Sequence, residues 1–138
     1  MRVSAYAGPN ARLSDGEFLK RYESHALKGF SHEDHVRMAF AYARRGGVAA
    51  AVGGARRIRG FAEAIGAPGK YHETLTVAWA RVIAHRALES EASSFEEFLE
   101  TYPQLRRRDL LSAHYTPELL FSPAARAAFV EPDLAPLP

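Results

Sequence analysis

Residues 30–37 read Phe30-Ser31-His32-Glu33-Asp34-His35-Val36-Arg37, and this stretch predicts the beginning of a helix. Ser31 followed three residues later by Asp34 is a capping pair, in which each side chain accepts a hydrogen bond from a backbone N–H of the first turn. Apolar residues then recur at helical spacing through residue 43. His32 and His35 lie one turn before two of these apolar positions. Both imidazoles are therefore expected on the buried face of the helix.

A buried imidazole needs a polar partner, because leaving it unpaired is unfavourable. His72 begins another predicted helix and also continues an apolar face. Short connections favour antiparallel neighbours, so predicted helices 32–45, 48–65 and 71–88 alternate in direction and bring the two histidine-bearing helix starts to one end. We therefore predict that His32, His35 and His72 hold a divalent metal ion with an open coordination position. Zinc and iron are the favoured ions, and nitrogen ligands alone do not choose between them.

The residues around His72 predict the chemistry of such a site. Glu73 and Tyr71 are the candidate catalytic residues, which would move a proton to or from a metal-activated water or substrate oxygen. His25, Glu73 or water is the candidate fourth ligand. The start of the helix offers free backbone N–H groups that favour an anion, so the expected partner is a small, anionic substrate. The alternative is that each histidine is structural and bonds to a carbonyl or a carboxylate, near helix ends that leave backbone groups free to bond.

The whole chain, residues 1–138, is predicted to be one all-α domain, a bundle of four to five helices. Helices are expected over residues 14–26, 32–45, 48–65, 71–88 and 94–102, from capping pairs and apolar periodicity. Residues 1–13 have no periodicity and are interpreted as a lead-in arm. Residues 116–138 are expected to form short turns, begun by Thr116-Pro117 and Ser122-Pro123, and then an extended tail.

Composition sets limits on the class of protein. A hydrophobic content of 47% and a charged content of 25% are ordinary for a globular domain. There is neither a long apolar run nor a basic, apolar signal-like start, so we expect a cytoplasmic protein without a membrane partner. Cysteine is absent, so disulfides and thiolate ligands are excluded and a metal would depend on His, Asp or Glu.

The charges are unevenly distributed along the chain. Residues 1–70 carry a formal charge of +6 and residues 71–138 a charge of −4. This asymmetry supports a second hypothesis from another class, a non-catalytic helical module whose basic N-terminal half binds protein or nucleic acid. The arginine clusters lack a recognisable nucleic-acid-binding motif, and solvated helix faces explain them more simply. The alanine-rich residues 48–65 would suit a close helix contact in a homodimer.

Three segments resemble those of a group of short, uncharacterised bacterial helical proteins. The group shares a Phe-Ser/Thr-His-x-x-His segment like residues 30–35, a Lys-Tyr-His-Glu-Thr segment like residues 70–74, and an Arg-Ala-Ala-Phe/Trp-Val-x-Pro-Asp tail like residues 126–133. The resemblance covers roughly residues 30–138. It implies that His32, His35 and residues 71–73 belong to one constellation, and it implies no substrate.

Overall fold

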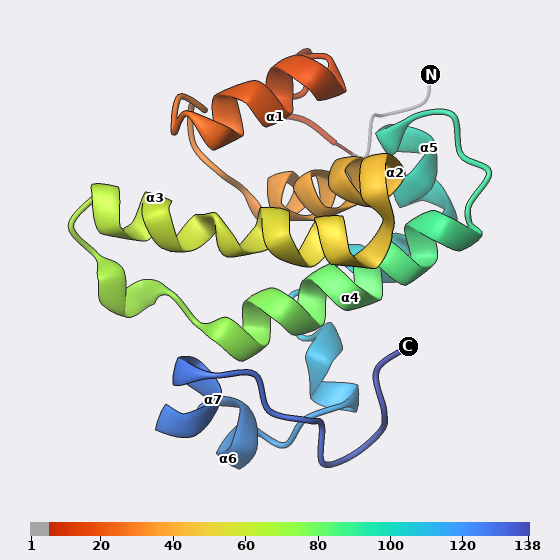
Figure 1. Ribbon diagram of the computed structural model, residues 1–138. Coiled ribbons are helices and arrows are strands. Elements are labelled where there is room, and N and C mark those ends of the chain that lie inside the picture. Colours follow the sequence, from red (N-terminus) through yellow and green to blue (C-terminus); the bar gives the residue numbers. More distant parts are fainter. Residues whose placement is uncertain (1–5) are drawn as a thin grey trace.

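The computed structural model describes residues 6–138, which form helices and turns without a strand, so the all-α prediction is confirmed (Figure 1). None of its helices combines the length and the apolar character that crossing a membrane requires. The α-helices are α1 (Asp15–Glu23), α2 (His32–Arg56), α3 (Ile58–Ala64), α4 (Glu73–Glu89), α5 (Phe95–Thr101), α6 (Pro117–Leu120) and α7 (Pro123–Ala127). Three short 3-10 helices are η1 (Pro68–Lys70), η2 (Pro103–Arg106) and η3 (Leu110–Ala113).

Helix α2 is a helical hairpin. Gly46 and Gly47 have non-helical dihedral angles, with φ of 77° at Gly47, and the chain reverses its direction there (Figure 1). The predicted end of the helix at these two glycines is therefore confirmed. Residues 48–65, predicted as one helix, form the second arm of α2 and then α3, with a break at Arg57. The two arms of α2 approach closely because Gly54 has no side chain where the Tyr42 ring packs.

The predicted capping residues all begin helices. Ser14, Ser31, Ser94, Thr116 and Ser122 each accept a hydrogen bond from the backbone N–H three residues later. The Asp34 carboxylate in turn accepts a hydrogen bond from the Ser31 backbone N–H, which completes the capping box. These contacts are local, so a short stretch of sequence is enough to predict them.

His72 differs from its prediction. It was expected in the first turn of its helix, but it is the residue before that turn, with extended dihedral angles (φ −138°, ψ 109°). Its own side chain caps α4 by accepting a hydrogen bond from the Leu75 N–H. Because His72 lies just outside the helix, its role as a cap sets the orientation of the imidazole. The helical periodicity that places Leu75 on a face does not apply to His72.

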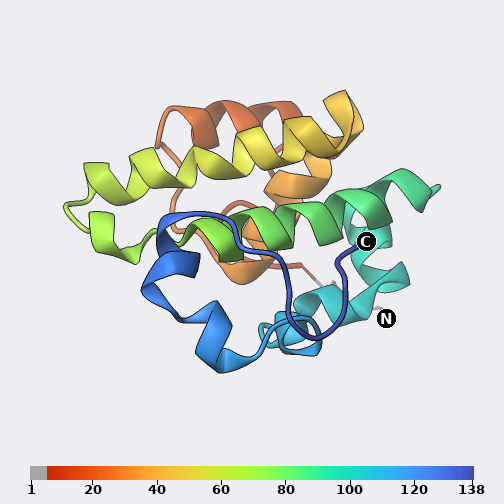
Figure 2. The ribbon, with the colours of Figure 1, turned by 60° about the horizontal axis from the view of Figure 1, so that its bottom comes forward.

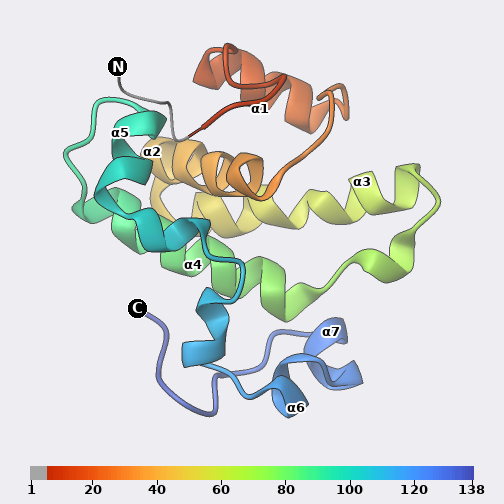
Figure 3. The same cartoon turned by 180° about the vertical axis from the view of Figure 1, so that it is seen from behind.

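The centre of the molecule is the packing of α2 against α4, with α1 on the opposite side of α2 (Figure 1). Helix α5 packs beside the first arm of α2 through Phe40, whose ring lies 4.6 Å from that of Phe98 (Figure 3). The C-terminal chain returns across α4 (Figure 2). There Thr74, fully buried, donates to the Ala128 carbonyl and accepts from the Val130 N–H.

The N-terminal segment is part of the core, within the part of the chain that is described. Residues 1–5 of the predicted arm lie outside it. Tyr6 and Asn10 are buried, each with 3% of its surface exposed, and both donate to the buried Asp34 carboxylate. Arg37, also buried, donates to the backbone carbonyls of Asn10 and Leu13. A buried polar network therefore fixes this segment onto α2.

Candidate functional site

The His72 ring has both nitrogens engaged by the backbone. Nδ1 accepts from the Leu75 N–H at 3.1 Å, so Nε2 carries the proton and donates to the Leu120 carbonyl at 2.7 Å. Burial lowers the pKa of His72, which favours this neutral form. The geometry supports the alternative reading of His72 as a structural histidine. It leaves no lone pair of this ring for a metal ion.

His32, at the start of α2, contacts α4 at a point farther from His72 than the sequence suggested. Its ring packs against Trp79, with 4.9 Å between the ring centroids, and its Nε2–H donates to the Leu105 carbonyl at 2.8 Å. Trp79 follows His72 by seven residues, which corresponds to roughly 10 Å along a helix axis. The structure therefore places the His32 ring beside a residue about two turns along α4 from His72, whereas the sequence reasoning expected both rings at one end.

His35 borders the same cavity as His32 and packs against the Phe30 ring at 4.2 Å between centroids. Burial lowers the pKa of His35 to about 4, the nearby His32 adds to this decrease, and Asp34 opposes it. The ring is therefore neutral at neutral pH. No hydrogen bond joins it to any of residues 6–138. It keeps one N–H donor and one nitrogen acceptor for a bound molecule.

The two predicted catalytic residues contact each other away from this cavity. The Tyr71 hydroxyl donates to one carboxylate oxygen of Glu73, and Arg56 pairs with the other oxygen at 2.9 Å. Burial and this hydrogen bond raise the pKa of Tyr71 to about 12. Glu73 is thus already occupied on both oxygens, and neither residue borders the cavity where His32 and His35 lie. The structure does not bring them together with the histidine pair.

The remaining ligand candidates are also dispersed. His25, exposed and with a positive φ of 58°, lies with its ring 5.9 Å from that of Phe61. Within residues 6–138, no group of three or more His, Asp or Glu side chains is placed to hold a metal ion. The metal ion itself, zinc or iron, stays a prediction from the sequence.

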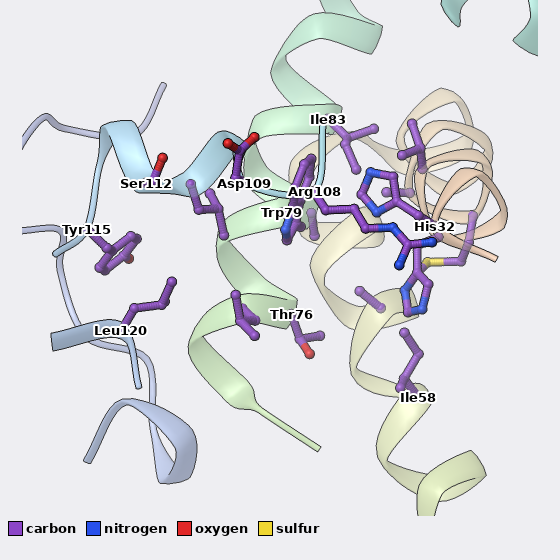
Figure 4. A pocket seen from close by; sticks show the side chains of 18 of the residues that line it. His32, Ile58, Thr76, Trp79, Ile83, Arg108, Asp109, Ser112, Tyr115 and Leu120 are labelled. Carbon is purple, nitrogen blue, oxygen red and sulfur yellow. The ribbon is translucent and has the colours of Figure 1, made fainter. Parts of the chain in front are cut away.

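A cavity of about 430 Å³ lies between α2, α4 and the chain from Arg108 to Phe121 (Figure 4). We call it the α2–α4 cavity. Its wall is mainly apolar, with two imidazoles and a few hydroxyl groups on it. The apolar side chains include those of Val36, Met38, Ile58, Leu75, Trp79, Ile83, Leu111 and Leu120. The exposed side chains on its edge are those of Arg108, Asp109, Ser112, Pro117 and Phe121.

Two of the predicted ligands hold the outer wall of this cavity in place. We call residues 105–121 the wall segment. His32 bonds to the carbonyl of Leu105 at its beginning, and His72 bonds to the carbonyl of Leu120 near its end. The tail supports the same segment, because the Tyr115 hydroxyl donates to the Val130 carbonyl at 2.7 Å. The histidines thus position the wall segment on α2 and α4.

Sequence reasoning did not locate the wall segment. Residues 103–113 form short 3-10 turns, which have no apolar periodicity to detect. Arg108 was interpreted as a solvated arginine, and no signal in the sequence separates it from Arg106 and Arg107. Ser112 was missed for the same reason. His114-Tyr115 was considered as a pair that could line the mouth of the site, and Tyr115 does border the cavity.

Several basic side chains of the N-terminal half are used within the protein. Arg37 is buried, Arg44 donates to the Ala92 carbonyl, and the ion pairs of this half include Arg21–Glu17, Arg56–Glu73 and Arg59–Glu63. These contacts reduce the charge left for an outside partner. The interaction-module hypothesis and the homodimer stay predictions.

In comparisons with known proteins, neither a protein-family model, nor a curated protein, nor a solved structure matches this chain.

Proposed function

We propose that this protein binds a small, largely apolar organic molecule in the α2–α4 cavity. The observation that carries the proposal is a cavity of about 430 Å³ with an apolar wall and one neutral imidazole, His35, that has no hydrogen-bond partner among residues 6–138. Ligand-binding pockets commonly measure about 300 to about 1,000 Å³ and combine an apolar wall with few polar groups.

The wall favours an apolar ligand for a physical reason. Water in such a cavity has few hydrogen-bond partners, so its release is favourable. An apolar molecule that replaces this water also removes its own apolar surface from bulk water, which is favourable as well. The Trp79 ring offers a flat surface for packing, and His35 offers one donor and one acceptor to orient a polar group. The proposal concerns binding and depends on neither a metal ion nor Glu73.

Trp79 makes the proposal testable because it is the single tryptophan of the chain and borders the cavity. Phenylnaphthylamine, a neutral fluorescent molecule, is titrated into the protein while energy transfer from Trp79 is followed. We expect saturable transfer with one site per chain. Thr76 borders the cavity, so Thr76→Phe fills part of it and should abolish the saturable signal.

The matched control is Thr101→Phe, which adds the same ring at an exposed position at the end of α5. This variant should bind the probe like the wild type. Circular dichroism verifies that both variants fold. Absence of saturable transfer in the wild type, or equal transfer in wild type and Thr76→Phe, would overturn the proposed function.

A further inference from the structure

We propose that the ligand of the α2–α4 cavity carries one acidic group, which pairs with the guanidinium of Arg108. The inference rests on the proposed function and names the chemical class of the ligand, an amphipathic organic anion such as a carboxylate or a sulfonate. Its apolar body would contact the Trp79 side of the cavity, and its charge would lie at the exposed edge.

The three consecutive arginines of the wall segment differ in their partners. Arg106 pairs with Glu33 at 3.7 Å, and Arg107 pairs with Asp109 at 3.4 Å. Arg108 has neither an ion pair nor a hydrogen bond with any of residues 6–138, and it is the arginine that borders the cavity. The cationic side chain at this edge is thus available for an anion from solution.

No other charged group on the cavity wall among residues 6–138 pairs with Arg108. Asp109 is the acidic residue on the wall among residues 6–138, and Arg107 pairs with it at 3.4 Å. In Figure 4 the Arg108 side chain extends towards His32, whereas the Asp109 carboxylate points away from that ring. His32 and His35 also border this cavity. An anion at this edge would therefore meet one cation and polar rings without a facing unpaired carboxylate.

The placement also fits the energetics of an amphipathic ligand. Arg108 and Ser112 are exposed, so the charged group of the ligand would keep part of its hydration while its body fills the apolar interior. A guanidinium offers parallel N–H donors that match the two oxygens of a carboxylate or sulfonate. Charge pairing and apolar burial would thus act on opposite ends of one molecule.

The test uses two probes that share one skeleton. Anilinonaphthalene sulfonate carries a sulfonate that phenylnaphthylamine lacks, and energy transfer from Trp79 reports the binding of each probe to the full-length protein. We expect the wild type to bind the sulfonate about tenfold more tightly than the neutral probe, as one charge-assisted contact predicts. Binding of the sulfonate should weaken as salt is raised.

Variants separate this inference from the proposed function. Arg108→Gln should weaken sulfonate binding about tenfold and leave the neutral probe unchanged, and Arg108→Lys should restore part of the loss. Arg106→Gln is the matched control and should change neither. Equal affinities of the wild type for the two probes, or an equal effect of Arg108→Gln on both, would overturn the anion while the cavity stands. Failure of the wild type to bind the neutral probe would overturn the proposed function and this inference with it.

Discussion

His72 and Leu120 are 48 residues apart in sequence, and a 2.7 Å hydrogen bond joins the imidazole Nε2 to the Leu120 carbonyl. The other nitrogen of the same ring caps α4. The His72 side chain therefore connects the start of α4 to the end of the wall segment. These two hydrogen bonds give the histidine a structural role that does not depend on a metal ion.

Replacing His72 should destabilise the protein, and by different amounts in two variants. His72→Ala removes the cap and the bond to Leu120 and leaves a small void, so we expect the free energy of unfolding to fall by about 2–4 kcal/mol. His72→Asn keeps a capping side chain that is too short to reach Leu120, and its loss should be about half as large. Urea denaturation measures both changes.

Denaturation with a chelator or with added zinc tests the metal prediction, with His72→Ala as the reference. We expect the wild-type free energy of unfolding to be unaffected by a chelator or by added zinc, since the bonds of His72 are to the backbone. A chelator that lowers the stability of the wild type to that of His72→Ala would restore the three-histidine metal site.

Acidification should weaken the fold through His35. Its pKa is about 4 in the folded protein and about 6.5 when unfolded, so between these values only the unfolded chain binds the proton. The stability is complete above about pH 6.5, falls as the pH decreases, and stops changing on this account below about pH 4. The loss should be on the order of 1–3 kcal/mol. Denaturation of wild type and His35→Leu across this range isolates it, and two parallel curves would contradict it.

Gly54 and Gly53 should respond oppositely to alanine. A Cβ on Gly54 would overlap the Tyr42 ring, so Gly54→Ala should lower the free energy of unfolding by about 1–3 kcal/mol. Gly53 is exposed, with nothing within 4 Å of the added carbon, and Gly53→Ala should raise it by about 0.5–1 kcal/mol through helix propensity. Thermal denaturation of the pair is the measurement. Equal effects would mean that the two arms of α2 do not pack as described.

Asp34 should be needed for docking of the N-terminal segment. It accepts from the Tyr6 hydroxyl at 2.6 Å and from Asn10 at 3.1 Å, so Asp34→Ala leaves buried donors unpaired and should cost about 3 kcal/mol. Glu33→Ala is the control in the same turn. It loses a 3.7 Å pair with Arg106 and should cost less than about 1 kcal/mol. Equal losses in urea denaturation would show that Asp34 acts as a helix cap alone.

The histidine prediction shows how far periodicity extends. The spacing of His32 and His35 placed both rings on the inner face of α2, and the structure has them on one cavity wall. Periodicity gives the face of a helix but not how far it slides along its neighbour. His32, at the start of α2, packs on Trp79, about two turns beyond His72 on α4.

By itself, the amino-acid sequence specified the helices, their serine and threonine caps and the reversal at Gly46-Gly47. These features depend on contacts within a few residues of one another. Long-range packing specified the carbonyl partners of His32 and His72, the pairing of Glu73 with Arg56, and the cavity that Arg108 borders. Each of these joins segments far apart in the chain, and the 3-10 turns of the wall segment have no repeating pattern from which their position could be inferred.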